Sequence, residues 1–252
     1  MLAPAWFVTE KPNPQARLRL LCFPHAGGGV RAYRGWGAEQ PDWLEISVAV
    51  LPGRDRLLGV PPRRSVDELV PVLVASLEPF FRQGPFAVFG HSVGALVGFE
   101  VCRALSAEGF STPQALVVCG RRAPQLPGPE GTIHDRPDVE VLDLLRWYGD
   151  VPGRTLPHSV WSKLFLPALR ADLALEDTYR HRSDAPLGLP LMAYAGDQDP
   201  SVTEAELRAW GSQTAAQFRA RTLSGGHFFV QETPGVLQRV TDDLAEVVKH
   251  LL

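Results

Sequence analysis

Apolar positions form two kinds of segment that alternate along the chain. Short runs typical of strands, several of them almost continuously apolar, lie at 18–23, 46–51, 86–89, 115–119, 191–195 and 218–223. Longer amphipathic patterns predict helices at 66–81, 93–108 and 236–251. Strands that alternate with helices form a mostly parallel sheet with helices on both faces. The pattern therefore predicts one α/β domain.

Residues 121 to about 186 interrupt this alternation. A stretch rich in proline and glycine at 123–131 is followed by amphipathic segments without a convincing strand. We expect a helical lid insertion over one end of the sheet, within a single domain of residues 1–252. Its apolar residues are expected to pack a small core of their own and, in part, to line a substrate channel. They include Val139, Leu142, Leu145, Trp147, Leu164, Leu169 and Leu173.

Length and composition limit the classes of protein that fit. The 252 residues suffice for one well-cored α/β domain, and 45% hydrophobic with 21% charged residues is typical of a folded globular chain. A net charge of −3 gives no positive field for nucleic acid or anionic membranes. The first 14 residues lack the apolar core of a signal peptide, and no run is long enough to span a bilayer. We expect a cytoplasmic protein that binds neither nucleic acid nor membrane.

The cysteines add no site of their own. Cys22, Cys102 and Cys119 cannot form a closed disulfide set, and they lack the spacing of metal ligands. We expect them to be small apolar residues in the core.

The pentapeptide at 90–94 carries the strongest chemical signal. It reads Gly-His-Ser-Val-Gly and lies between the strand predicted at 86–89 and the helix predicted at 93–108. This is the setting of the G-x-S-x-G nucleophile elbow, where glycines permit a tight turn and the serine projects from the strand end. The alternative is a buried turn whose serine only caps the helix. Because suitable partners follow downstream, we predict Ser92 as a catalytic nucleophile.

A serine nucleophile needs an acid and a base, which follow it in that order in this fold. His227 is the histidine that comes after a later strand, at 218–223, preceded by two glycines that leave room for the loop. Asp197 and Asp199 both follow the strand at 191–195. We favour Asp199 as the acid, because it lies further from the strand, and expect Asp197 to brace the loop.

The stretch Phe-Pro-His-Ala-Gly-Gly-Gly at 23–29 follows the first long apolar strand. α/β-Hydrolases place there a loop that donates one backbone N–H to the tetrahedral oxyanion. We expect Ala26 to be this donor and the N–H of Val93, after the nucleophile, to be the second. The alternative is that the small residues form only a flexible loop. His25 and His91 are expected to make structural hydrogen bonds.

Six motifs together resemble one family, the stand-alone type II thioesterases that accompany modular polyketide synthases and nonribosomal peptide synthetases. They are Phe-Pro-His-Ala-Gly-Gly at 23–28, Leu-Pro-Gly-Arg at 51–54, the elbow at 90–94, Gly-Arg-Arg-Ala-Pro at 120–124, Gly-Asp-Gln-Asp-Pro at 196–200 and Gly-Gly-His-Phe-Phe at 225–229. The Arg-Arg-Ala-Pro run before a helical insertion is more specific than any triad motif. Val93 departs from the family, which often has methionine there, and we expect altered packing without loss of activity.

The resemblance implies an α/β-hydrolase fold with a mobile lid at 121–186. It also implies hydrolysis of acyl groups from the phosphopantetheine arm of an acyl or peptidyl carrier protein, which clears stalled or mis-primed chains. We expect a monomer that needs no cofactor and no metal, because an activated hydroxyl and an oxyanion hole suffice for a thioester. A subset of arginines near the site mouth is expected to contact the arm's phosphate or the acidic carrier protein. The candidates are Arg31, Arg54, Arg56, Arg63, Arg64, Arg121 and Arg122.

Other functions fit the same triad. A medium-chain fatty acyl thioesterase and a small-molecule carboxylesterase would use the same three side chains, and acyl transfer to a second acceptor would use the same intermediate. A chain-terminating domain of a synthase is less expected, because the sequence begins at Met1 without a carrier domain ahead. A binding protein on a hydrolase scaffold would not need an intact triad, which speaks against that alternative.

Overall fold

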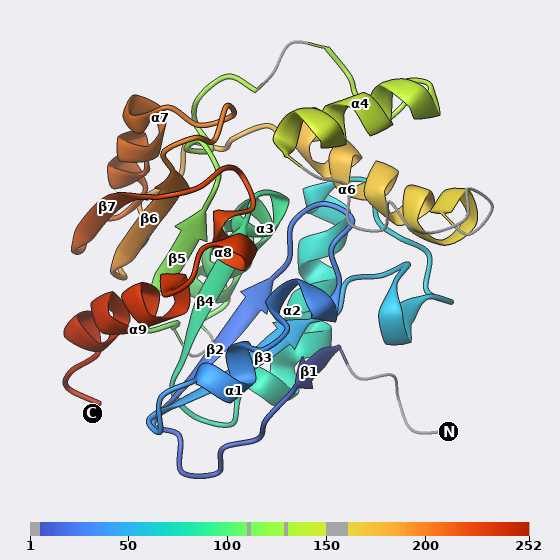
Figure 1. Ribbon diagram of the computed structural model, residues 1–252. Coiled ribbons are helices and arrows are strands. Elements are labelled where there is room, and N and C mark those ends of the chain that lie inside the picture. The colour runs from blue at the N-terminus through green and yellow to red at the C-terminus, as the bar shows by residue number, and fades with distance from the viewer. Residues whose placement is uncertain (1–5, 110–111, 129–130, 150–160, 252) are drawn as a thin grey trace.

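A computed structural model describes residues 6–109, 112–128, 131–149 and 161–251 of the chain. Within them, seven strands form one sheet in the order β1-β3-β2-β4-β5-β6-β7 (Figure 1). The strands are β1 (Phe7–Thr9), β2 (Leu18–Phe23), β3 (Leu44–Ala49), β4 (Phe86–His91), β5 (Leu116–Cys119), β6 (Leu191–Gly196) and β7 (Phe218–Leu223). Only the edge strand β1 runs antiparallel to its neighbour, so the predicted mostly parallel sheet is confirmed.

Helices cover both faces of this sheet. One face carries α2 (Val66–Phe81), α3 (Val93–Ala107), α7 (Glu204–Arg208) and the 3₁₀ segment η4 (Ala209–Gln213), and the other carries η1 (Val30–Tyr33), α1 (Trp36–Glu39), α8 (Phe229–Glu232) and α9 (Val236–Val247). Strand β4 shows the division, because Val88 packs into the first core and its neighbours Ala87 and Phe89 pack into the second. Helix α2 begins as predicted, with the Ser65 hydroxyl accepting the N–H of Glu68 at 3.2 Å.

The insertion lies over the carboxyl ends of the strands (Figure 1). Its described residues form α4 (Asp138–Tyr148), the short π-helical segment η3 (Trp161–Phe165) and α6 (Leu166–Thr178), with no strand among them. Leu145, Leu169 and Leu173 belong to a small separate core, as expected. The same expectation was wrong for three other side chains, which extend into solvent: Val139, Trp147 and Leu164.

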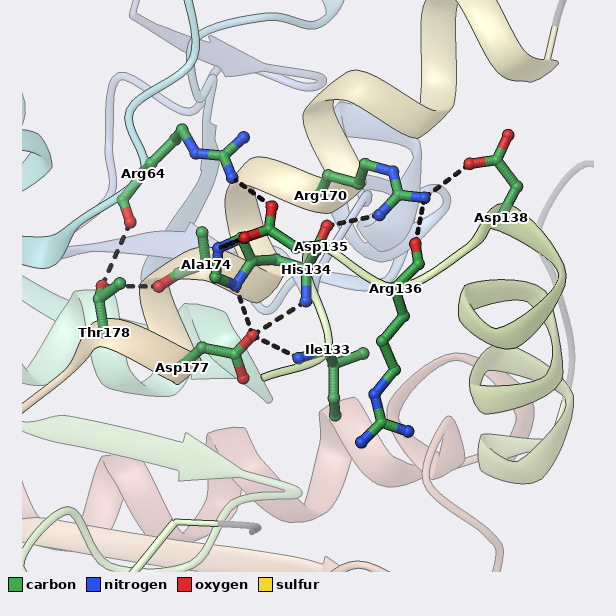
Figure 2. A network of polar contacts seen from close by, with 10 residues as sticks. All are labelled: Arg64, Ile133, His134, Asp135, Arg136, Asp138, Arg170, Ala174, Asp177 and Thr178. Carbon is green, nitrogen blue, oxygen red and sulfur yellow. Dashed lines mark hydrogen bonds and ion pairs between the residues drawn. The ribbon is translucent and has the colours of Figure 1, made fainter. Parts of the chain in front are cut away.

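Polar contacts fasten the segment before α4 to α6 (Figure 2). The Asp177 carboxylate accepts the backbone N–H groups of Ile133 and His134 at 2.7 and 2.9 Å and also contacts the His134 imidazole Nδ1 at 2.6 Å. Arg170 donates to the carbonyl of Arg136 at 2.7 Å and to the carboxylate of Asp138 at 2.6 Å. The entry to α4 is therefore bound to α6 before the helix starts.

Two further expectations concern the rest of the chain. Cys22, Cys102 and Cys119 are free and buried in the two cores, as expected. Among the helices of the described residues, none combines the length and the apolar character that crossing a membrane requires.

Candidate active site

Ser92 occupies a strained turn between β4 and α3. Its backbone has φ 56° and ψ −120°, a conformation that non-glycine residues rarely adopt. The Ser92 N–H donates to the carbonyl of Cys119, the last residue of β5, at 2.8 Å. The turn projects the serine side chain from the strand end into a cavity of about 480 Å³. The predicted elbow is present.

The two glycines of the elbow are required by close backbone contacts. A Cβ on Gly90 would lie 2.2 Å from the carbonyl oxygen of Gly94. A Cβ on Gly94 would lie 2.2 Å from the carbonyl oxygen of Phe23 and 2.5 Å from that of Pro24. These contacts also bring the loop after β2 against the start of α3, where an oxyanion would form.

His227 hydrogen-bonds to Asp199. The imidazole Nδ1 lies 2.9 Å from the carboxylate Oδ2, and both side chains are almost completely buried. The other oxygen, Oδ1, accepts the N–H and the hydroxyl of Ser201 at 2.9 and 2.6 Å. Burial by itself would raise the pKa of Asp199, but the hydrogen bonds from His227 and Ser201 outweigh it and lower the pKa below its usual value.

This geometry fixes the tautomer of His227. A carboxylate only accepts, so Nδ1 carries a proton and Nε2 is available as the base. His227 and Ser92 line the same cavity. The structure therefore brings all three predicted triad residues to one edge of the sheet.

Asp197 has a different contact. Its Oδ1 accepts the N–H of Gly225 at 2.9 Å, which holds the loop that leads to His227. It is Asp199, and not Asp197, that meets the imidazole.

Two other histidines make structural hydrogen bonds, as expected. The His25 Nδ1 lies 3.1 Å from the carbonyl oxygen of Ala26. The His91 side chain is fully buried, and its Nε2 lies 2.8 Å from the carbonyl oxygen of His227, to which it must donate. Burial holds the pKa of His91 well below its usual value. His25 packs edge-on against His91 with ring centroids 5.5 Å apart, and burial lowers the pKa of His25 to about 4. Both rings are therefore neutral at pH 7.

Two N–H groups of the loop after β2 have acceptors. The Gly27 N–H donates to the Asp172 carboxylate at 2.7 Å, and the Gly28 N–H donates to the carbonyl of His25 at 2.9 Å. Within the described ranges, the N–H groups of Ala26 and Val93 have no hydrogen-bond acceptor. They are the two donors that the sequence predicts for an oxyanion.

The small residues of this loop are tightly packed. A Cβ on Gly27, which has φ 70°, would lie 2.7 Å from the Phe165 ring of η3. A Cβ on Gly29 would lie 2.3 Å from the carboxylate of Asp55, which accepts the N–H of Val30 at 2.9 Å. Close packing thus explains the run of glycines better than a flexible loop does.

The insertion contributes side chains that sequence reasoning missed. Tyr148 of α4 packs its ring on the His227 imidazole with centroids 4.4 Å apart, and burial raises the pKa of its hydroxyl above the usual value. Glu176 of α6 pairs with Arg121 at 2.6 Å on the cavity wall.

Ser201, which lies outside the insertion, was also missed. It supports Asp199 from the same turn, and its place two residues after an aspartate was the only available signal.

The arginine candidates divide between several places. Arg121 and Arg122 line the cavity. Arg54 is not in the subset near the site mouth, because it is buried in an ion pair with Asp172. The others lie at the surface away from the cavity, where Arg64 pairs with Asp135. In the part of the chain that the structure describes, no group of three His, Cys, Asp or Glu side chains is arranged to hold a metal ion.

Comparison with known proteins decides the family. The model of the thioesterase domain family matches residues 18–244 of this chain. The chain belongs to the thioesterase domain family. It is 37% identical over 227 residues to thioesterase PikA5 of Streptomyces venezuelae, which covers 90% of this chain and 80% of PikA5.

Solved structures agree. This thioesterase superposes on RedJ, a thioesterase of the prodiginine biosynthetic pathway in Streptomyces coelicolor, with a TM-score of 0.85 and 34% identity over 95% of this chain and 89% of RedJ. BorB, a type II thioesterase from the borrelidin biosynthetic cluster, gives a TM-score of 0.84 and 32% identity over 95% and 98% of the two chains. The resemblance to type II thioesterases is confirmed, and with it the α/β-hydrolase fold and the hydrolase class.

A fatty acid synthase enzyme is a more distant relative. The medium-chain S-acyl fatty acid synthase thioesterase of Homo sapiens is 28% identical over 226 residues, which is 86% of this chain and 83% of that enzyme. The comparisons therefore favour the type II thioesterases over the fatty acyl alternative.

Proposed function

We propose that this thioesterase hydrolyses acyl groups from the phosphopantetheine thioesters of acyl or peptidyl carrier proteins, and so clears stalled chains from a polyketide or nonribosomal peptide synthase. The observation that carries the proposal is that His227, which hydrogen-bonds to Asp199 at 2.9 Å, lines the same cavity as Ser92. The relatives support the carrier-bound substrate class, since BorB belongs to a biosynthetic cluster and RedJ to a biosynthetic pathway.

The first half of the proposed reaction forms an acyl-enzyme. The Ser92 hydroxyl attacks the thioester carbonyl while Nε2 of His227 accepts its proton, and the Asp199 carboxylate stabilises the resulting imidazolium. The N–H groups of Ala26 and Val93 donate to the oxyanion. When the tetrahedral intermediate collapses, the C–S bond breaks and the phosphopantetheine sulfur leaves with the proton from His227.

The second half returns the enzyme to its starting state. Water attacks the Ser92 ester while His227 takes its proton, and collapse releases the carboxylic acid as the proton passes to the serine oxygen. All the proposed catalytic groups come from one chain, which is why we propose a monomer as the active unit.

The charges of the cavity wall suit a carrier-bound substrate. Arg122 and Arg180 line the cavity together with Arg121; Arg121 is paired with Glu176 at 2.6 Å, and Arg122 lies 3.9 Å from the carboxylate of Glu206. We propose that the first two face the phosphate of the arm or acidic side chains of the carrier protein. The described part of the insertion, which lies over the strand ends in Figure 1, would cover the acyl group during the reaction.

The test is mass spectrometry of a carrier protein loaded with several acyl groups, before and after addition of the enzyme. We expect free carrier thiol and free acid with the native enzyme and no conversion with Ser92→Ala. A matched series of oxygen esters identifies a carboxylesterase if the esters are the better substrates. A fluorophosphonate probe that fails to label Ser92 would instead support the binding-protein alternative.

Acyl transfer is tested in the same assay. An added thiol or amine acceptor should leave the yield of free acid unchanged. If the acyl group moved to the acceptor at the expense of the acid, the enzyme would be a transferase.

A further inference from the structure

A buried ion pair contacts the loop that carries Ala26. The Arg54 guanidinium, in the segment after β3, donates to the Asp172 carboxylate of α6 twice, from Nη1 to Oδ2 at 2.6 Å and from Nη2 to Oδ1 at 2.7 Å. The exposed fractions of the two side chains are 8% and 4%. The partners are 118 positions apart in the sequence, so the pair joins the insertion to the body of the domain.

Both partners also bind the backbone next to Ala26. Oδ2 of Asp172 accepts the Gly27 N–H at 2.7 Å, and Nη1 of Arg54 donates to the Gly28 carbonyl at 2.8 Å. The Phe165 ring of the insertion packs directly against Gly27, on the side of the loop that faces the insertion. The peptide groups that follow the proposed oxyanion donor are thus fixed by charged side chains from two distant segments.

Stability alone does not account for this arrangement. A buried ion pair costs desolvation, and a well-packed apolar pair often stabilises a fold as well or better. An oxyanion donor, in contrast, must be held at a defined position before charge develops, and a small displacement greatly reduces the rate. Charge-assisted hydrogen bonds to the loop backbone supply that restraint.

We propose that Arg54 and Asp172 are positioning residues, which hold the Ala26 N–H toward the oxyanion and tie its loop to α6. The inference rests on the proposed function of Ser92, Ala26 and His227. In this arrangement α6 is part of the catalytic frame.

The test variant is Asp172→Asn. Its amide NH₂ replaces one carboxylate oxygen, so at least one of the three N–H donors loses its acceptor. We expect kcat to fall by about 10- to 100-fold, less than loss of a whole oxyanion donor, while KM changes by less than about 3-fold. The matched control is Asp143→Asn, which removes an exposed carboxylate paired with Arg146 on α4 and should leave kcat unchanged.

A transition-state readout separates positioning from folding. The Ser92 hydroxyl adds to a trifluoromethyl ketone analogue of the substrate, which forms an oxyanion that accepts a hydrogen bond from the Ala26 N–H in the proposed site. We expect its affinity for Asp172→Asn to fall by the same factor as kcat/KM, while a non-reactive thioether analogue binds as to the native enzyme. A purely structural role would lower the melting temperature without changing either affinity of the folded enzyme.

The double variant Arg54→Met with Asp172→Leu covers the case in which single variants fold poorly. It removes both charges, so we expect a higher melting temperature than either single variant shows, with kcat still reduced by at least 10-fold. Native turnover by the double variant, or by folded Asp172→Asn, would overturn the inference. If the native enzyme itself neither labels at Ser92 nor hydrolyses acyl carrier thioesters, the proposed function fails instead.

Discussion

Tyr148 and His227 lie ring against ring, with centroids 4.4 Å apart and planes inclined by 42°. The tyrosine belongs to α4 in the insertion and the histidine follows β7, so the contact joins the insertion to the proposed catalytic base. The insertion thus contacts the proposed base through Tyr148 and the loop that carries Ala26 through Asp172.

Removal of the Tyr148 ring should slow the reaction. Contacts between aromatic rings contribute about 0.5–1.5 kcal/mol beyond their buried area. We therefore expect Tyr148→Ala to lower kcat by about 3- to 10-fold, as the imidazole loses its packing partner, and Tyr148→Phe to keep near-native turnover. Steady-state kinetics on an acyl carrier thioester measures both.

The control for Tyr148 is Val139 on the same helix, which is 60% exposed. Val139→Ala should leave kcat within about 2-fold of the native value, in line with the small effects of exposed sites. An equal loss of turnover in both alanine variants would show that the effect comes from α4 as a whole.

The two aspartates of the turn after β6 should give opposite results. Asp199→Asn removes the acceptor that fixes the His227 tautomer, and we expect kcat to fall by about 10⁴-fold, as in other Ser-His-Asp enzymes. Asp197→Asn weakens only the hydrogen bond to Gly225, so it should cost about 1 kcal/mol of unfolding free energy with little effect on kcat. Urea unfolding and kinetics of both variants measure the difference. The opposite pattern would identify Asp197 as the acid.

Buried histidines should make the fold sensitive to acid. The pKa of His25 is about 4 in the folded protein, below its ordinary value of 6.5, so the unfolded chain binds a proton that the folded chain excludes between these values. Unfolding free energy should therefore decrease as the pH falls from 6.5 to 4, by about 3 kcal/mol for this side chain. His91 shifts in the same direction and adds to the slope.

Urea unfolding between pH 7 and 4.5 measures this dependence. The variant His25→Gln should show a shallower slope, by close to one proton, whereas replacement of the exposed His250 by glutamine should not change it. Equal slopes in the native protein and His25→Gln would contradict the assignment.

The sequence predicted the parts of the fold that have a local signature. The strands β2, β4, β5, β6 and β7 are runs bounded by turn residues, and their positions were predicted to within two residues. β1 was missed because three half-buried residues at a sheet edge give no periodic signal. β3 begins and ends two residues earlier than predicted. The predicted end was too late because Val50 and Leu51 are buried like strand residues but lie beyond the ladder.

The candidate site divides in the same way. Ser92 and His227 could be found because glycines and strand ends mark them in the sequence. Asp172 could not, because its role depends on a contact with Arg54 across 118 residues. Arg54, the last residue of the Leu-Pro-Gly-Arg motif at 51–54, could not be told from a surface arginine until the structure showed that it is buried. Tyr148 had no signal, because the helix that carries it is half exposed and its partner follows a distant strand.

The hydrogen bond from Ser92 to the Cys119 carbonyl separates two properties of the enzyme. Cys119 ends β5 and fixes the reactive residue, whereas the next residue, Gly120, begins the segment that forms one wall of the cavity. The fixed nucleophile and this wall of the cavity therefore adjoin at a single peptide bond. Exchange of residues 121–128 between relatives would change the wall that faces the acyl group while the attacking oxygen stays in place.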